Sequence, residues 1–167
     1  MINKSLDWYV AYTNSRSEKK VNLRLQQLGV ESFLPLQEVK KKWSDRIKTL
    51  EVPLFPNYIF VKTCVKKLPS IENMKGICKF IVYNRQFAKV KEEEITSIKR
   101  ILESKKNIEI LGLGFTSGDK VKVKVGHLEG MCGKLIRRKS KQYFVVELEE
   151  MQKQLLMDIP VNYLELI

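Results

Sequence analysis

Cysteine and histidine are the side chains that most often bind metals or act in nucleophilic pairs, and this 167-residue chain uses them sparingly. Cys64, Cys78 and Cys132 are isolated and form no Cys-x-x-Cys pair, and His127 is the single histidine. A zinc site or a nucleophile–histidine dyad needs more such groups at close spacing. The sequence also lacks a glycine-rich phosphate loop and a Gly-x-Ser-x-Gly motif. We therefore expect no enzyme, no metal site and no cofactor, and we expect reduced thiols.

Basic residues are concentrated in the first two thirds of the chain. The net charge is +12; residues 1–106 hold 22 Lys and Arg against 11 Asp and Glu, whereas residues 107–167 hold 9 against 8. Such an excess is typical of a protein that binds a polyanion. Arg16, Lys20 and Arg24 recur every fourth residue, which places them on one stripe of a helix. Like charges at this spacing cost stability, so the stripe indicates either a phosphate-facing edge or a solvated helix face.

An aromatic stretch, VPLFPNYIFV at 52–61, is the most apolar run in the first hundred residues. Tyr58 to Val61 predicts a buried strand, because it is rich in aromatic and β-branched residues. Phe55-Pro56 cannot lie inside that strand, because proline removes a donor from the ladder of hydrogen bonds. We expect Phe55 to project from a proline-flanked turn at the strand entrance. The alternative, that the rings are core, is strongest for Phe60.

Local patterns predict an α+β first domain, with its elements in the order β-α-β-β-α-β-α of a ferredoxin-like (split βαβ) unit. The strand at 7–13 places Trp8, Val10 and Tyr12 on one face. Ser15 and Glu18 match a capping box at the start of the first helix. The other expected elements are a helix to Leu28 with core residues Val21, Leu25 and Leu28, a basic hairpin tip at 40–48, a short helix at 68–74, a strand at 77–83 and a helix at 91–106. Trp43 in the hairpin tip either stacks on a base or pins the hairpin to the sheet.

The last fifty residues predict a small all-β domain that follows a linker. Alternation at 118–126 points Val121, Val123 and Val125 inward, and a five-stranded barrel is the natural closure for so short a β domain. Residues 147–159 conflict with that expectation, because they are made of good helix formers although the barrel needs strand, turn and strand. No apolar run approaches the roughly 20 residues that span a bilayer, and no signal peptide is recognisable. We expect a cytoplasmic protein with no membrane partner.

Two groups of motifs, in matching order at opposite ends of the chain, resemble the NusG family. Residues 8–10, 18–21, 52–61 and 75–77 resemble its amino-terminal (NGN) domain, and Gly118-Asp119-x-Val121-x-Val123-x-x-Gly126 with Gly133 resembles its KOW domain. The resemblance implies an NGN domain at 1–106, a linker at 107–117 and an SH3-like KOW barrel at 118–167. Features that resemble the specialised UpxY and RfaH types are Asn57, where general NusG usually has glycine, Phe33-Leu34-Pro35-Leu36 and Trp43-Ser44-Asp45-Arg46.

The resemblance implies a non-enzymatic elongation and antitermination factor that binds bacterial RNA polymerase. In the family, an apolar depression on the NGN domain binds the clamp helices of the β′ subunit, and the matching positions here are Trp8, Tyr12, Phe55, Pro56, Tyr58 and Phe60. A contact with the β gate loop would fall on Lys67 and Ser70, although Lys67-Leu68-Pro69-Ser70 replaces the RfaH-type His-Thr-Thr-Thr pattern. Specialised members also read non-template DNA, for which we expect Arg16, Lys20, Arg24 and Lys75.

Three functions remain open on this resemblance. The first is an UpxY-type factor for a surface-polysaccharide operon, which holds the clamp closed and suppresses pausing. The second is a general NusG that couples polymerase to Rho and the ribosome; the charged Glu150-Met151-Gln152-Lys153 replaces the family's Ile-Phe-Gly-Arg turn, so we expect weak or absent Rho binding. The third is a ribosome-associated KOW protein that binds RNA, which the near-neutral second domain disfavours. In a variant of the first function that resembles RfaH, residues 147–159 would refold as a helix and cover the patch that contains Phe55 and Tyr58.

Overall fold

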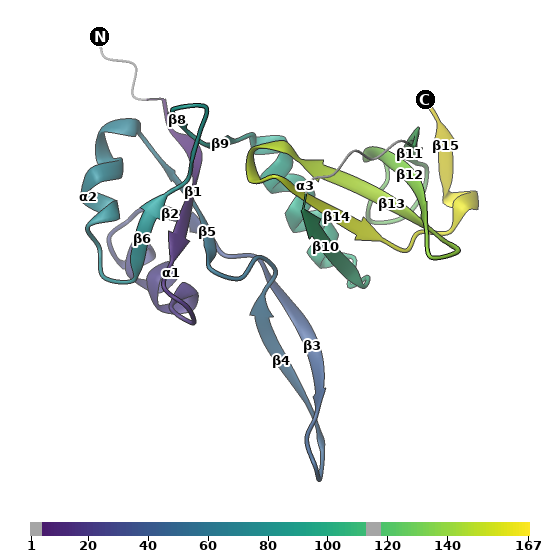
Figure 1. Cartoon of the computed structure of the whole chain (residues 1–167), viewed down its shortest axis with the longest axis horizontal. Coiled ribbons are helices and arrows are strands. Elements are labelled where there is room, and N and C mark those ends of the chain that lie inside the picture. Colours follow the sequence, from purple (N-terminus) through teal and green to yellow (C-terminus); the bar gives the residue numbers. More distant parts are fainter. Residues whose placement is uncertain (1–4, 113–117) are drawn as a thin grey trace. The chain divides into compact units, whose positions relative to one another are not determined.

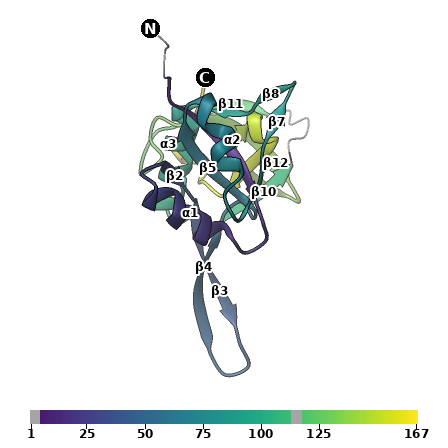
Figure 2. The same cartoon turned by 90° about the vertical axis from the view of Figure 1, so that its left-hand side faces the viewer.

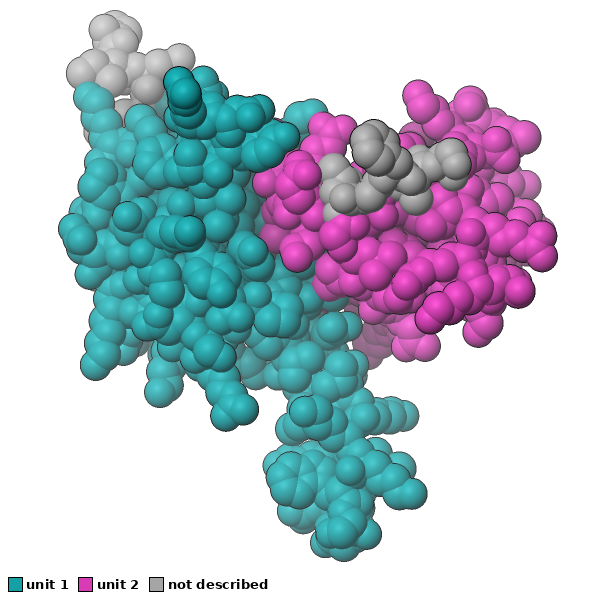
Figure 3. Space-filling model, in the orientation of Figure 1, with its two compact units in different colours: residues 1–92 teal, residues 93–167 magenta. Residues whose placement is uncertain are grey.

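The chain forms two compact units, residues 1–92 and 93–167, in a computed structural model that describes residues 5–112 and 118–167 (Figure 3). Each unit has a β-sheet of its own. The division that we predicted, at 106 and 118, stays a prediction, and residues 113–117 of its linker lie outside the described residues. None of the described helices is long and apolar enough to span a membrane.

The first unit has the predicted β-α-β-β-α-β order, with a long hairpin inserted after its second strand (Figure 1). Its elements are β1 (Asp7–Thr13), α1 (Glu18–Gln27), β2 (Glu31–Phe33), β3 (Leu36–Lys42), β4 (Ile47–Pro53), β5 (Tyr58–Thr63), η1 (Val65–Lys67), α2 (Leu68–Glu72), β6 (Ile77–Phe80), β7 (Val82–Tyr83), β8 (Gln86–Phe87) and β9 (Lys89–Val90).

The sheet of the first unit has the strand order β2-β5-β1-β6, and β9 also pairs with β1. Alternation along β1 turns Tyr9 and Ala11 toward a core that α1 and α2 complete with Val21, Leu25 and Leu68. The period-two prediction for this strand is therefore confirmed, because Trp8, Val10 and Tyr12 are left for the opposite face. The core prediction was wrong for Leu28, which follows the last helical residue and is 69% exposed.

The β3–β4 hairpin is the inserted element, and it extends away from the sheet in both cartoon views (Figures 1 and 2). Its strands pair in register from Leu36 with Pro53 to Lys42 with Ile47. Trp43 at the tip is 55% exposed, so it does not pin the hairpin to the sheet. Residues 40–49 are all exposed, which leaves the lysines of the tip accessible to a partner.

The second unit is a helix followed by a β-sheet. Its elements are α3 (Glu92–Glu103, whose first residue belongs to the first unit), β10 (Ile108–Gly112), β11 (Asp119–Val123), β12 (Cys132–Arg138), β13 (Lys141–Leu148), η2 (Glu149–Met151), β14 (Lys153–Met157), η3 (Val161–Tyr163) and β15 (Leu164–Leu166). The six strands of the sheet have the order β10-β14-β13-β12-β11-β15. Arg100 of α3 is anchored within this unit, because its guanidinium donates hydrogen bonds to the carbonyl oxygens of His127 and Glu129.

The second unit differs from the expected barrel in several places. Residues 108–112, which we assigned to the linker, form β10 and pair with β14. Val121 and Val123 are buried as predicted, but Val125 lies beyond the end of β11 and is exposed. Among the described residues no pairing joins β10 to β15, and the closed five-stranded barrel stays a prediction.

The conflict over residues 147–159 is resolved as strand, turn and strand. β13 continues to Leu148, η2 makes the turn, and β14 begins at Lys153. Gln152 adopts a left-handed conformation, with φ 53°, and its side chain donates a hydrogen bond to the Glu149 carbonyl oxygen. Leu155 and Leu156 are buried within the sheet, and pairing along both edges of β14 thus overrides helix propensity.

Candidate functional site

Three cross-strand pairs form the face of the first sheet opposite its α1–α2 core. β1 and β5 pair Trp8 with Lys62, Val10 with Phe60, and Tyr12 with Tyr58. We call these six residues the aromatic face. Trp8, Val10 and Phe60 are buried, whereas Tyr12 and Tyr58 are only partly buried and contact each other edge to face, with ring centroids 5.4 Å apart. The tyrosine pair is therefore the aromatic part of this face that remains accessible.

The turn that leads into β5 is built by Pro56 and Asn57. The Tyr58 amide donates a hydrogen bond to the Phe55 carbonyl oxygen over 3.1 Å, which closes a four-residue turn. Proline at its second position and a positive φ of 69° at Asn57 make this a type II turn. Pro56 is exposed at its corner, so this predicted contact residue lies beside Tyr58 on accessible surface.

The expectation that Phe55 projects from the proline-flanked turn was wrong. Its ring is 2% exposed and packs edge to face on Phe60, which in turn stacks on Phe33. The proline fixes the chain direction, but the type II turn points the preceding side chain inward, beside the buried Leu54. Phe55, Phe60 and Phe33 therefore form one aromatic cluster, which joins the aromatic face at Phe60. Phe33 is a member of this cluster that sequence reasoning missed.

Asn57 also anchors the start of α1, in place of the predicted capping box. The buried Glu18 carboxylate accepts a hydrogen bond from the Asn57 amide over 2.8 Å, and no side-chain bond caps the helix at Ser17. The Asn57 side chain donates to the Thr13 carbonyl oxygen over 3.2 Å. The capping-box prediction was wrong, because the Glu18 carboxylate accepts its hydrogen bond from the distant Asn57 amide and not from a backbone amide at the start of its own helix.

Replacing Asn57 by alanine is expected to lower the free energy of unfolding of the first unit by about 2 kcal/mol. About half is the cost of a left-handed conformation for alanine, which lacks the short polar side chain that lets asparagine adopt it, and the rest is the lost side-chain hydrogen bond. Asn57→Gly loses only the hydrogen bond and should cost about half as much. Urea titration monitored by tryptophan fluorescence measures both. Equal losses in the two variants would mean that backbone conformation contributes nothing.

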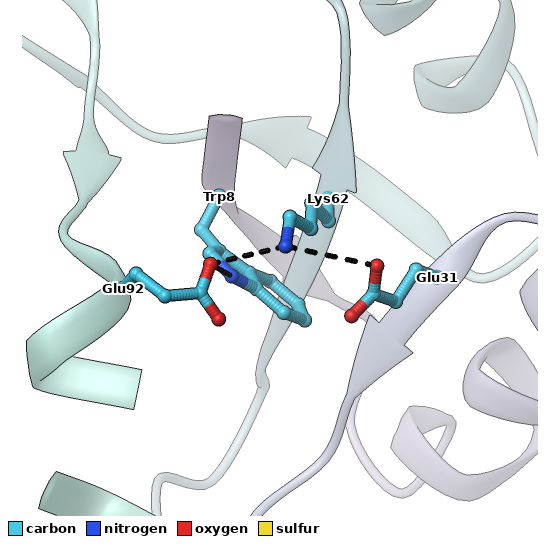
Figure 4. Close-up of polar contacts among 4 residues, drawn as sticks. All are labelled: Trp8, Glu31, Lys62 and Glu92. Carbon is cyan, nitrogen blue, oxygen red and sulfur yellow. Dashed lines mark hydrogen bonds and ion pairs between the residues drawn. The ribbon is translucent and has the colours of Figure 1, made fainter. Parts of the chain in front are cut away.

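The Trp8 end of the aromatic face is held by charged residues (Figure 4). The indole nitrogen donates a hydrogen bond to Glu92 over 2.8 Å, and the Lys62 ammonium lies 3.0 Å from the same carboxylate oxygen and 3.9 Å from a Glu31 oxygen. Lys62 also lies 5.5 Å from the centre of the Trp8 ring. The hydrogen bond to Glu92 raises the pKa of Lys62. Sequence reasoning missed this network, because its two acids lie 23 and 84 residues after Trp8 along the chain.

Alkaline pH is expected to destabilise the first unit. Burial raises the pKa of Tyr9, although Lys89 opposes the rise, and hydrogen bonds to Glu92 and Asp7 raise the pKa values of Lys62 and Lys89. All three groups bind their protons more tightly in the folded chain, so their stabilisation is complete below about pH 10, near their unfolded values. It is lost as the pH rises through the folded values.

Urea titrations should therefore give a free energy of unfolding that is level between about pH 8 and 9.5 and falls above about pH 10. Tyr9→Phe keeps the ring and removes its titrating proton, so the variant should show a shallower fall. An equally steep fall in Tyr9→Phe would contradict the assignment to Tyr9.

The four residues expected at nucleic acid lie at the α1 end of the first unit. Arg24 donates a hydrogen bond over 2.6 Å to the carbonyl oxygen of Lys75, which brings these two together. Lys20 is exposed on α1, but Arg16 precedes the helix in a left-handed conformation, with φ 59°. The predicted helical stripe is therefore wrong at Arg16. Gly76, with φ 103°, allows close approach, because a β-carbon there would lie 2.7 Å from Val21.

The two expected gate-loop residues lie together at the start of α2. Lys67 ends η1 and is exposed, and the Ser70 hydroxyl donates a hydrogen bond to the Lys67 carbonyl oxygen over 2.8 Å. This bond caps the local turn, so the Ser70 proton is not available to a partner in this conformation.

Metal-binding residues do not gather anywhere in the described part of the chain: no group of three or more His, Cys, Asp or Glu could hold an ion there. All three cysteines are free thiols; Cys78 and Cys132 are exposed, and the Cys78 sulfur lies 2.8 Å from the Asn14 side-chain oxygen.

Comparison with known proteins identifies relatives of this arrangement. A family model described as transcription termination factor NusG matches residues 6–99, more than half of the chain. A solved structure of Thermotoga maritima NusG, described by its domain interaction, aligns with 22% identity over 97% of each chain and a TM-score of 0.57. A chain of the MjSpt4:Spt5 complex, conformation B, aligns with 16% identity over 96% of each chain and a TM-score of 0.33. A search of curated proteins finds no match.

Proposed function

The chain belongs to the NusG family, and from that premise we propose that it is a non-enzymatic transcription elongation and antitermination factor. It binds bacterial RNA polymerase in the cytoplasm, at the clamp helices of the β′ subunit. The observation that carries the proposal is the accessible Tyr12–Tyr58 pair, which shares the aromatic face with the buried Trp8 and Phe60. Tyrosines on a rigid support bury a large area at low entropic cost, which is typical of interface hot spots.

The proposed mechanism is mechanical. Tyr12, Tyr58 and Pro56 contact the clamp helices, and the buried Phe55 and Phe60 anchor the turn and the strand that carry Pro56 and Tyr58. Trp8 contributes through its network with Glu92 rather than by contact with the partner. Binding at the clamp holds it closed over DNA, which suppresses pausing and lets polymerase pass terminators. Lys67 offers a charge to the β gate loop, in place of the hydroxyl groups of the RfaH-type pattern.

Exposed non-template DNA is the proposed second partner, at Arg16, Lys20, Arg24 and Lys75. The excess of 22 basic over 11 acidic residues in 1–106 supports a polyanion on this part of the chain. The exposed Trp43 and lysines of the β3–β4 tip add an aromatic ring beside positive charges, a combination that binds single strands.

Replacing Arg16 and Lys20 by alanine is expected to weaken binding of a single-stranded oligonucleotide and to reduce the salt slope of its affinity by about 1.4, since two phosphate contacts are lost. Fluorescence anisotropy at several salt concentrations measures the slope. Lys139→Ala, which removes an exposed charge from the second unit, serves as the control. An unchanged slope in the double variant would mean that these residues form a solvated face.

The proposal expects weak or absent binding to Rho, because the charged Glu150-Met151-Gln152-Lys153 stands where the family has an apolar, glycine-bearing turn. The ribosome remains a candidate partner for the second unit. A general NusG that couples polymerase to Rho is the alternative function. A ribosomal RNA-binding KOW protein is less favoured, because residues 107–167 are near neutral.

In vitro transcription separates these functions. The template is a surface-polysaccharide leader that carries an intrinsic and a Rho-dependent terminator. The proposal expects increased read-through at both terminators when the protein is added to bacterial polymerase. Stimulation of Rho-dependent termination would instead identify a general NusG. Unchanged read-through and pausing on every template would overturn the proposal of an elongation factor.

A further inference from the structure

A cavity of about 770 Å³ lies within the first unit, and none of its lining residues belongs to the aromatic face. The start of β1, the segment from Cys64 to Lys67 and the β7–β8 hairpin form its walls. Its volume falls within the range of roughly 300–1,000 Å³ typical of small-molecule sites. Of its lining residues, the proposed binding to polymerase uses Lys67 alone, at the gate loop.

One part of the cavity wall is apolar. The ring of Phe87 lies there and contacts Tyr9 edge to face, with centroids 6.4 Å apart, so the phenylalanine is held in place. Val65 and Val82 flank the cavity and remain 53% and 56% exposed. Apolar side chains that stay in contact with water favour a ligand that covers them.

The other part of the wall is cationic. Lys66, Lys67 and Arg85 line the cavity and are exposed, and within residues 5–112 and 118–167 none of them has a carboxylate partner. Lys89 is different, because it pairs with Asp7 over 2.9 Å. Three unpaired cations around one cavity favour an anion that carries more than one negative charge.

Arg85 is held at the cavity in an unfavourable backbone conformation. Asn84 and Arg85 form the two-residue loop of the β7–β8 hairpin, with φ values of 50° and 62°. Positive φ at both positions is the type I′ turn, whose second position is usually glycine. A turn chosen for stability alone would carry glycine there, whereas the arginine adds charge to the cavity.

We propose that this cavity binds a nucleotide, whose base covers Phe87, Val65 and Val82 and whose phosphates contact Lys66, Lys67 and Arg85. A purely apolar ligand would leave the three cations without partners, and an inorganic phosphate would leave the apolar wall in water. A nucleotide satisfies both parts, and the Gln86 amide beside the wall can hydrogen-bond a base edge. The same chemistry is offered by a free nucleotide and by the 5′-phosphorylated end of a single strand.

Isothermal titration of the whole chain with ATP, GTP, CTP and UTP tests the proposal, with inorganic triphosphate as the probe of charge alone. We expect at least one nucleotide to bind with a Kd below about 1 mM and more tightly than triphosphate. Amide shifts of residues 64–67 and 82–89 should move in NMR spectra on titration. The proposal would be overturned if none of the four nucleotides showed saturable binding. It would also be overturned if inorganic triphosphate bound as tightly as every nucleotide.

Arg85→Gly separates a binding role from a structural one, because the two effects have opposite signs. The glycine should stabilise the type I′ turn and raise the Tm, yet weaken nucleotide binding about fivefold or more by loss of an ion pair. Lys66→Ala should weaken binding similarly. Lys79→Ala, which removes an exposed charge outside the cavity, should leave the Kd within about twofold. Unchanged affinity in Arg85→Gly would overturn the site.

Competition then assigns the source of the ligand. A 5′-phosphorylated oligonucleotide that displaces the bound nucleotide, when its unphosphorylated counterpart does not, would assign the cavity to a strand end. Displacement by mononucleotides alone would assign it to a free nucleotide. Both results support the nucleotide chemistry. Equal displacement by the two oligonucleotides would overturn it, because the cavity would then recognise only backbone charge.

Discussion

Replacing Tyr12 and Tyr58 together by alanine is expected to weaken binding to bacterial RNA polymerase by about 100-fold, because accessible tyrosines at an interface centre are typical hot spots. The two rings contact each other across β1 and β5, on the same face as the buried Trp8 and Phe60. Alanine removes both contact surfaces at once. The affinity is measured by biolayer interferometry with immobilised polymerase.

Three further variants test whether the loss of affinity comes from the missing tyrosine contact surface rather than from unfolding. Tyr12→Phe with Tyr58→Phe keeps both rings and should bind within about fivefold of wild type. Tyr83→Ala removes a tyrosine that is 47% exposed outside the aromatic face and should leave binding unchanged. Phe55→Ala, by contrast, should lower the free energy of unfolding by about 3–5 kcal/mol, because its ring is core. An alanine double variant that folds and binds like wild type would contradict the role of the pair.

Gly133→Ala is expected to destabilise the second unit by about 3 kcal/mol, since overpacking against backbone cannot relax easily. A β-carbon at Gly133 would lie 2.5 Å from the Val145 carbonyl oxygen and 2.7 Å from the Phe144 ring. Gly133 pairs with Val121 of β11, and the next residue, Lys134, pairs with Val145 of β13. The strand therefore cannot move aside without breaking a ladder on one of its edges.

Gly112→Ala is the matched control in the same sheet, because a β-carbon at Gly112 meets nothing within 4 Å. Its free energy of unfolding should stay within about 0.5 kcal/mol of wild type. Loss of amide peaks from β12 and β13 during a urea titration reports the second unit by itself. If Gly133→Ala unfolds at the same urea concentration as Gly112→Ala, the close packing at Gly133 does not exist in solution.

Elements with strong local signals could be predicted from the sequence. The strand at 7–13 has the same bounds in the structure, because alternation and aromatic content agree over seven residues. The second long helix, predicted at 91–106, is shorter as α3, but Ile95, Ile98 and Ile101 are buried as its apolar stripe requires. The short helix at 68–74 also formed, with proline in its first turn.

Features that depend on distant residues could not be predicted. Glu18 had a local role as a capping residue, but an amide 39 residues away takes its carboxylate. The stretch 147–159 favoured helix locally, yet pairing of β14 with both β10 and β13 makes it a strand. The sequence alone also could not tell which aromatic residues of the candidate site stay accessible. Phe55 and Tyr58 are the first and last residues of one turn, and their positions in that turn decide that Phe55 is buried and Tyr58 is accessible.

The measurement that tests the central claim most directly is competition for the whole chain between core RNA polymerase and an isolated fragment of the β′ clamp helices. The account predicts saturable binding of wild type to core polymerase, and it predicts that the fragment competes fully for the same site. The Tyr12→Ala, Tyr58→Ala double variant should bind neither. Absence of saturable binding to polymerase, or binding that the clamp-helix fragment leaves unchanged, would contradict the account.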